Sequence, residues 1–155
     1  MSMPILNRVN AAHPDFRRLV RFLDIELAER DGADNAFYSQ FNNLTTIRNC
    51  VVAYIDGQAV GCGAIKDFSR ERQEVKRMYV LPGWRGKGVA AQVLAELECW
   101  ALEQGYTYCV LETGKRQPEA IRLYEKSGYV QIPNYGQYIG VDNSVCFEKR
   151  LTPGS

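Results

Sequence analysis

The chain has 155 residues, a net charge of +1 and 24% charged residues, and 46% of its residues are hydrophobic. This length and composition predict one soluble globular domain, residues 1–155, with room for a real core. The near-neutral charge argues against a general nucleic-acid or membrane-surface binder, because both need a basic excess. No apolar run reaches the roughly 20 residues of a membrane helix, and the first residues lack the apolar stretch of a signal peptide. We therefore expect a cytoplasmic protein without a nucleic-acid or membrane partner.

Five cysteines are spread singly along the chain without a Cys-x-x-Cys pair, and the only histidine is His13. Isolated cysteines in odd number, three of them within apolar runs, predict reduced thiols that act as small core residues. A single histidine leaves few ligands for a metal ion and few bases for a cysteine nucleophile. We expect no metal site.

The first part of the chain predicts a strand and two helices. Residues 5–9 form a short strand, and Pro14 begins a helix that stops before Asp31. This helix buries one face, because apolar residues recur on it at helical spacing: Phe16, Leu19, Val20, Leu23 and Leu27. A weaker helix is predicted over residues 35–42, which contain three aromatic residues.

The middle of the chain predicts three consecutive strands. Residues 50–55 and 59–65 are apolar runs joined by Asp56-Gly57, a strong signal for a β-hairpin. A turn at residues 69–73 leads to the next strand, at residues 74–80.

Helices and strands alternate in the second half. A glycine-rich loop opens into a helix that runs to about Gln104, where Gly105 ends it. Further segments are predicted as a buried strand at 107–111, a helix at 118–126, and strands at 129–132 and 144–150. The predicted order is β-α-α-β-β-β-α-β-α-β-β, with antiparallel strands first and a βαβ crossover in the middle.

The loop before the long helix carries the clearest functional signal. The first backbone N–H groups of a helix have no partner within it, and the helix dipole makes that end partly positive. Gly86 and Gly88 allow a ligand to approach these groups closely, while Arg85 and Lys87 add positive charge. The loop is therefore predicted to bind a phosphate or pyrophosphate.

Two other interpretations of this loop stay open. The glycines could simply cap a surface helix. The pattern Gly86-x-Gly88-x-x-Ala91, with Glu112 near the end of the next strand, also fits a loose dinucleotide-binding motif and thus an NAD(P)-binding oxidoreductase. Against the second interpretation, residues 82–85 separate the glycines from the preceding strand.

Two segments resemble a known family. The pattern Arg-x-x-Gly-x-Ala at Arg85, Gly88 and Ala90 resembles the coenzyme A pyrophosphate loop of the GNAT superfamily of N-acetyltransferases. Residues 117–129 are similar to the family's Asn-x-x-Ala-x-x-Leu-Tyr-x-x-x-Gly-Phe/Tyr helix, with Gln117 at the asparagine position. The resemblance implies the GNAT fold, an α/β (α+β) fold. About four helices flank a mixed, mostly antiparallel sheet of about seven strands, whose fourth and fifth strands splay apart.

The resemblance implies acetyl-CoA as cosubstrate. Its pantetheine arm would pair with the backbone of the fourth strand, and its pyrophosphate would bind the loop amides. The expected contacts are Met78, Tyr79, Val80, Arg85, Gly86, Lys87, Gly88, Val89, Ala90, Gln117 and Tyr124.

Direct attack of a neutral amine on the thioester needs a base and an acid. Tyr124 matches the tyrosine of the family's second motif and is the expected acid, because a phenol with a pKa of about 10 is protonated at neutral pH. Glu74, at the start of the fourth strand, is the expected base. Glu112 is its rival, and ordered water is a third alternative.

The implied function is acetyl transfer to a primary amine of a small molecule. Arg77 and its neighbour Lys76 could anchor a carboxylate, which would suggest an amino-acid-like acceptor. The expected acceptor contacts are Phe37, Tyr38, Arg77, Glu112, Tyr135 and Tyr138. A protein or peptide N-terminus as acceptor and a non-catalytic acyl-CoA-binding module remain alternatives, and a homodimer remains open.

Overall fold

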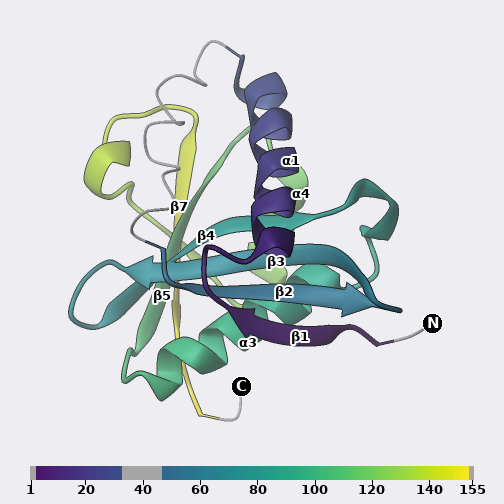
Figure 1. Cartoon of the computed structure of the whole chain (residues 1–155). Helices are drawn as coiled ribbons and strands as arrows, with labels where there is room; N and C mark the ends of the chain where they lie inside the picture. The colour runs from purple at the N-terminus through teal and green to yellow at the C-terminus, as the bar shows by residue number, and fades with distance from the viewer. Residues whose placement is uncertain (1–2, 33–46, 154–155) are drawn as a thin grey trace.

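The computed structural model describes residues 3–32 and 47–153 (Figure 1). Seven of its elements are strands: β1 (Ile5–Val9), β2 (Asn49–Ile55), β3 (Gln58–Asp67), β4 (Arg72–Val80), β5 (Tyr108–Gly114), β6 (Val130–Ile132) and β7 (Ser144–Arg150). The α-helices in these ranges are α1 (Pro14–Asp31), α3 (Val89–Glu103) and α4 (Pro118–Lys126). Short 3₁₀ turns lie at Pro82–Trp84 and Gly136–Tyr138.

The predicted fold class is confirmed. The strands form one mixed sheet in the order β1-β2-β3-β4-β5-β7-β6, and β4 and β5 are the parallel neighbours within it. A dinucleotide-binding fold sets several parallel strands side by side, so this topology does not support the oxidoreductase alternative. The helix predicted over residues 35–42 lies outside the described residues.

Two predicted strand ends were wrong in a way that matters for the site. β4 begins at Arg72 instead of residue 74, so Glu74 lies inside the strand. β5 continues to Gly114 instead of ending at residue 111, because Glu112 and the two residues after it stay paired with β7. The apolar run of β5 ends at Leu111, which suggested a strand end there, but Glu112, Thr113 and Gly114 still pair with β7.

Side chains alternate between the two faces of the sheet, as the strand geometry requires. On β2, Cys50 and Val52 pack with α1, while Val51 and Ala53 pack with α3. Helix α4 adds Tyr124 to the α3 side. The sheet therefore lies between α1 on one face and α3 with α4 on the other (Figure 1).

A β-bulge interrupts β4 beside β3. Cys62 pairs with Tyr79 and Ala64 pairs with Lys76, so Arg77 and Met78 face a single residue of β3. Arg77 has φ 60°, which is a left-handed conformation at a residue other than glycine. The facing residue is Gly63, where a Cβ would lie 2.9 Å from Leu97 Cδ1 and 3.0 Å from Val93 Cγ1. Glycine at this position thus lets α3 pack directly on the bulge.

The two parallel strands separate soon after they meet. Their ladder covers Arg72–Glu74 of β4 and Tyr108–Val110 of β5 and ends just before the bulge. In Figure 1, β5 and β7 rise steeply away from the direction of β2 and β3. Beyond Glu74, the β5-facing edge of β4 has no ladder partner among the described strands.

Helix α1 is tied to the β5–α4 side of this opening. Arg30 forms an ion pair with Glu119 of α4. Arg116, just before α4, donates from Nη1 to the carbonyl of Asp31 at 2.9 Å. The C-terminal end of α1 therefore joins the two diverging halves of the sheet.

All five cysteines carry free thiols, as expected, and four of them are buried. Burial raises the pKa of the Cys50 and Cys109 thiols to about 12 and that of Cys146 to about 11. Cys99, on α3, is the exposed one. Among the described helices, none is both long and apolar enough to cross a bilayer.

Candidate active site

A cavity of about 560 Å³ lies where β4 and β5 diverge. Its wall comprises residues 75–80 of β4, the loop before α3 with the first turn of that helix, and residues 112–114 of β5. Helix α4 contributes from Gln117 to Lys126, and α1 contributes Leu23, Glu26, Leu27 and Asp31. One cavity therefore contacts the glycine loop and the ends of both diverging strands.

The glycine loop has the geometry of an anion site. Gly86 and Gly88 have φ 76° and 84°, and a Cβ at either position would meet no atom within 4 Å. Gly88 is the N-cap of α3 and has no side chain that could cap the helix. The backbone N–H groups of the first turn therefore stay available to a ligand. Gly86, Gly88, Val89 and Ala90 all line the cavity, whereas Lys87 is exposed outside its wall.

Arg85 also lines the cavity, but its side chain is already engaged. Its Nε donates to the carbonyl of Val80 at 2.8 Å, and its Nη2 donates to Oε1 of Glu26 at 2.9 Å. The guanidinium also lies 5.3 Å from the ring centre of Tyr79. Arg85 thus fixes the loop against β4 and α1 while its positive charge stays beside the glycine loop.

The other predicted cofactor contacts lie along the same cavity. Met78, Tyr79 and Val80 line it from β4, and Gln117 and Tyr124 line it from α4. Tyr124 is 6% exposed, and its ring packs against Tyr129 with 5.8 Å between ring centres. Burial, together with the negative charge of Glu112, raises the pKa of the Tyr124 phenol above its usual value.

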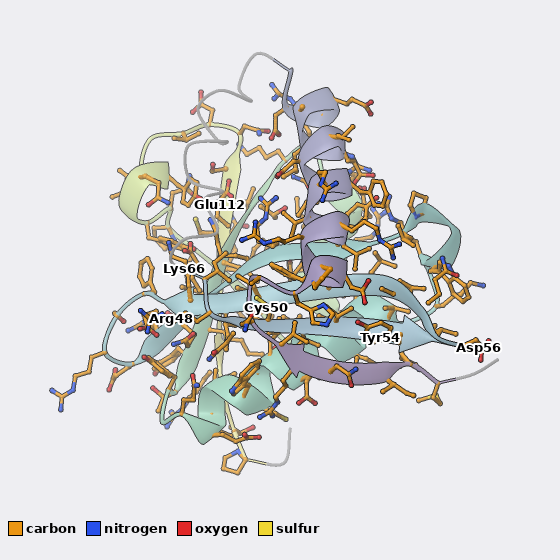
Figure 2. The ribbon with its side chains drawn as sticks, viewed as in Figure 1. Arg48, Cys50, Tyr54, Asp56, Lys66 and Glu112 are labelled. Carbon is orange, nitrogen blue, oxygen red and sulfur yellow. The ribbon has the colours of Figure 1, made fainter. Side chains whose placement is uncertain are left out.

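Glu112 is the carboxylate of β5 that lines the cavity, and it lies beside β7, well away from Asp56 at the β2–β3 turn (Figure 2). Burial raises its pKa to about 7, although Ser144, which donates from Oγ at 2.7 Å, and the charge of Lys76 both lower it. The charges of Asp31 and Glu74 raise it further. A carboxyl group in this state exchanges protons near neutral pH.

Glu74 has a different environment. It is 2% exposed, is not part of the cavity wall, and accepts a 2.6 Å hydrogen bond from the Tyr135 hydroxyl. Burial and the adjacent Glu74 charge raise the pKa of Tyr135, so the phenol keeps its proton. Tyr135 is likewise outside the cavity wall.

Lys76 and Tyr138 lie together at the same end of the cavity as Glu112. Both line it, and Lys76 Nζ donates to the Tyr138 hydroxyl at 3.5 Å. Burial lowers the pKa of Lys76, although the charges of Glu74 and Glu112 oppose this effect. The loop that carries Tyr138 is held by Asn134, whose Nδ2 lies within 3.2 Å of three backbone carbonyl oxygens.

The structure thus places most of the predicted site residues in one cavity and leaves some apart. Phe37 and Tyr38 lie outside the described residues. Ser144 and Glu26 were missed, because a serine at a strand start and a glutamate on an amphipathic helix carry no distinctive sequence signal. In the ranges 3–32 and 47–153, no group of three or more His, Cys, Asp or Glu side chains is arranged to hold a metal ion.

Comparisons with known proteins point to one family. Residues 46–131 match the family model for the acetyltransferase (GNAT) domain. The chain is 38% identical over 102 residues to "IAA acetyltransferase" of Azospirillum brasilense, covering 65% of this chain and 67% of that protein. It is 34% identical over 101 residues to YsnE of Bacillus subtilis, an uncharacterized N-acetyltransferase, covering 64% and 67%.

Solved structures agree with these relatives. A protein of Klebsiella pneumoniae, provisionally described as an acyl-CoA N-acyltransferase, superposes with a TM-score of 0.80 at 28% identity, covering 97% of this chain and 99% of that one. A GNAT family acetyltransferase of Elizabethkingia anophelis, solved with acetyl-CoA bound, has the same fold with a TM-score of 0.71 at 18% identity, covering 97% and 100%.

The raised pKa of Glu112 predicts a measurable cost to stability. Between its usual pKa of 4.5 and about 7, the unfolded chain releases a proton that the native state retains. Native stability therefore falls as pH rises through this window, and the cost is complete above it. We expect Glu112→Gln, which can still accept the bond from Ser144, to stabilise the protein more at pH 8 than at pH 5, by on the order of 1–3 kcal/mol.

Urea denaturation of both proteins at the two pH values measures this difference. The exposed Glu125→Gln, on α4, is the matched control and should show the same small effect at both values. An equal effect of Glu112→Gln at pH 5 and pH 8 would contradict the raised pKa.

Proposed function

The chain belongs to the GNAT acetyltransferase family, and we propose that it transfers the acetyl group of acetyl-CoA to the primary amine of a small molecule. The observation that carries this proposal is the single cavity that connects the glycine loop with Glu112 and Tyr124. The loop amides and a pair of groups suited to proton transfer thus line the same cavity.

The residues present fit acetyl-CoA. Its pyrophosphate would bind the amides from Gly86 to Ala90, where the open glycines leave room for phosphate oxygens. Its pantetheine amides would pair with the backbone of Met78–Val80, because this edge of β4 has lost its β5 partner and an extended chain can replace a missing strand. Bound there, acetyl-CoA supplies the thioester carbonyl that the amine attacks.

We assign the base role to Glu112. The base must lie beside the incoming amine and must be both deprotonated and able to accept a proton near neutral pH. Glu112 lines the cavity and has a pKa of about 7, and Ser144 orients its carboxylate. Glu74 remains a prediction from the sequence. Its bond from Tyr135 and its position outside the cavity wall favour a role in holding the β6–β7 loop.

Tyr124 remains our candidate for the acid. Its raised pKa keeps the phenol protonated, and a thiolate with an ordinary pKa of about 8.5 is basic enough to accept that proton. Packing against Tyr129 and Phe147 holds the ring in one orientation. Tyr124 would donate to the coenzyme A sulfur as the thioester bond breaks.

Other acceptors can be separated by one assay. Coenzyme A release is measured across a panel of small amines, amino acids and short peptides. Turnover confined to peptides would favour a protein N-terminus as acceptor. Binding of acetyl-CoA without release on any amine would favour the non-catalytic module.

Gly88→Glu should reduce affinity for coenzyme A at least about a hundredfold, because it places a carboxylate against the pyrophosphate and like charges in contact cost several kcal/mol. Isothermal titration calorimetry measures the effect. Gly88→Ala is the control, because it shares the backbone strain at φ 84° but adds no charge. Wild-type affinity in Gly88→Glu would overturn the assignment of the loop.

Tyr124→Phe removes only the hydroxyl. If Tyr124 donates the proton, kcat should fall by about 10²–10⁴-fold, while affinity for acetyl-CoA changes little because the ring still packs. Single-turnover kinetics with calorimetry measure both quantities. An unchanged rate of the chemical step would make Tyr124 a packing residue.

The base assignment predicts different pH profiles for two matched variants. In wild type, kcat/KM should fall on the acid side with an apparent pKa near 7, set by Glu112. Glu112→Gln should lose this limb, so that the rate rises with pH toward the pKa of the amine itself. Glu74→Gln should keep it. The reverse pattern would return the base role to Glu74.

A further inference from the structure

Arg77 stands out in the cavity wall. It lies at the β4 bulge with φ 60°, and its side chain is 1% exposed. A left-handed conformation is strained for a residue with a Cβ, and a buried guanidinium carries a further cost of desolvation. Glycine would avoid both costs at this position.

The guanidinium of Arg77 is only partly paired. Nη2 forms an ion pair with Asp24 of α1, whose side chain is 53% exposed. Nε is buried and has no hydrogen-bond partner among the described residues. Unpaired buried donors are rare in native proteins and call for a specific explanation, such as a ligand that is bound during function.

The neighbouring residue adds a second positive charge. Lys76 lines the same cavity, and its Nζ donates to the neutral hydroxyl of Tyr138 at 3.5 Å. None of the ion pairs between described side chains includes Lys76. Two adjacent cations on β4 therefore face a cavity whose β5 side carries the carboxylate of Glu112.

We propose that Arg77, supported by Lys76, binds a carboxylate of the acceptor, so that the acceptor is an amino-carboxylic acid. This inference rests on the proposed acetyl transfer. Nε supplies the free donor, and Arg is well matched to a planar carboxylate. The charge arrangement is complementary to such a molecule, because the cations attract its carboxylate while Glu112 receives its ammonium group and accepts the proton.

The experiment uses matched acceptors that differ only in this group. Coenzyme A release is measured for α- and ω-amino acids and for the corresponding carboxamides, which keep the amine and the shape but lack the negative charge. We expect wild type to prefer the carboxylate member by about tenfold to hundredfold in kcat/KM, the range for one hydrogen bond between charged groups. Arg77→Met should bring this ratio close to one, and Arg77→Lys should restore part of it.

Asp24→Asn separates ligand binding from a purely structural role. It removes the carboxylate that competes for Arg77, so the preference for the charged acceptor should increase. A structural ion pair would change the melting temperature in this variant and leave the ratio unchanged. If Arg77→Met does not fold, the ratio in Asp24→Asn decides, and an unchanged or lower ratio overturns the inference.

Failure of the inference can be told apart from failure of the proposed function. Equal turnover of carboxylates and carboxamides by wild type, or a wild-type ratio in Arg77→Met, would overturn the inference alone. Release of no coenzyme A with any amine, despite binding of acetyl-CoA, would overturn the proposed transfer itself.

Discussion

The brevity of the β4–β5 ladder is the constraint on which the site depends. Parallel pairing stops at Glu74, and a bulge at Arg77 follows three residues later. The backbone of β4 then presents an unpaired edge to a cavity instead of to a neighbouring strand. The sheet itself does not close this gap, and helix α1 bridges it. Arg30 of α1 pairs with Glu119 of α4, and Arg116, just before α4, donates to the carbonyl of Asp31 in α1. The opening is thus built into the sheet and does not depend on flexible loops.

The groups around the cavity are arranged at a cost to stability. Glu112 is held where its charged form is disfavoured, Lys76 where its pKa is lowered, and Arg77 where one N–H is unpaired. Strongly perturbed titratable groups that share a cleft are typical of functional sites. Each of these groups would be less strained in water or beside a full set of partners. Their positions around one cavity are the observation on which the proposed amino-carboxylic acid acceptor rests.

Much of this could be predicted from the sequence, and the failures have physical causes. The elements followed from period-2 and helical spacing, and the glycine loop at the start of α3 followed from Gly86 and Gly88. The bulge could not be predicted, because Arg77 occupies a conformation for which glycine is the usual signal. Whether Glu74 or Glu112 is the better candidate for the base depends on which side chain reaches the cavity. That in turn depends on strand ends, which shifted by two or three residues in both strands. Ser144 and Tyr135, the partners of the two carboxylates, lie on segments more than thirty residues from them in sequence, at separations of 32 and 61 positions.

The distribution of the cysteines has a practical consequence for measuring this enzyme. Acetyl transfer releases coenzyme A, whose thiol is commonly counted with aromatic disulfide reagents that react with thiolates. Four of the five protein thiols are buried, and burial raises their pKa values and keeps them protonated, so each native chain offers Cys99 as the reactive group. The background of such an assay is therefore one thiol per folded molecule and rises to five when the chain unfolds. The same reagent therefore measures released coenzyme A in an activity assay and the unfolded fraction of the protein in a stability assay.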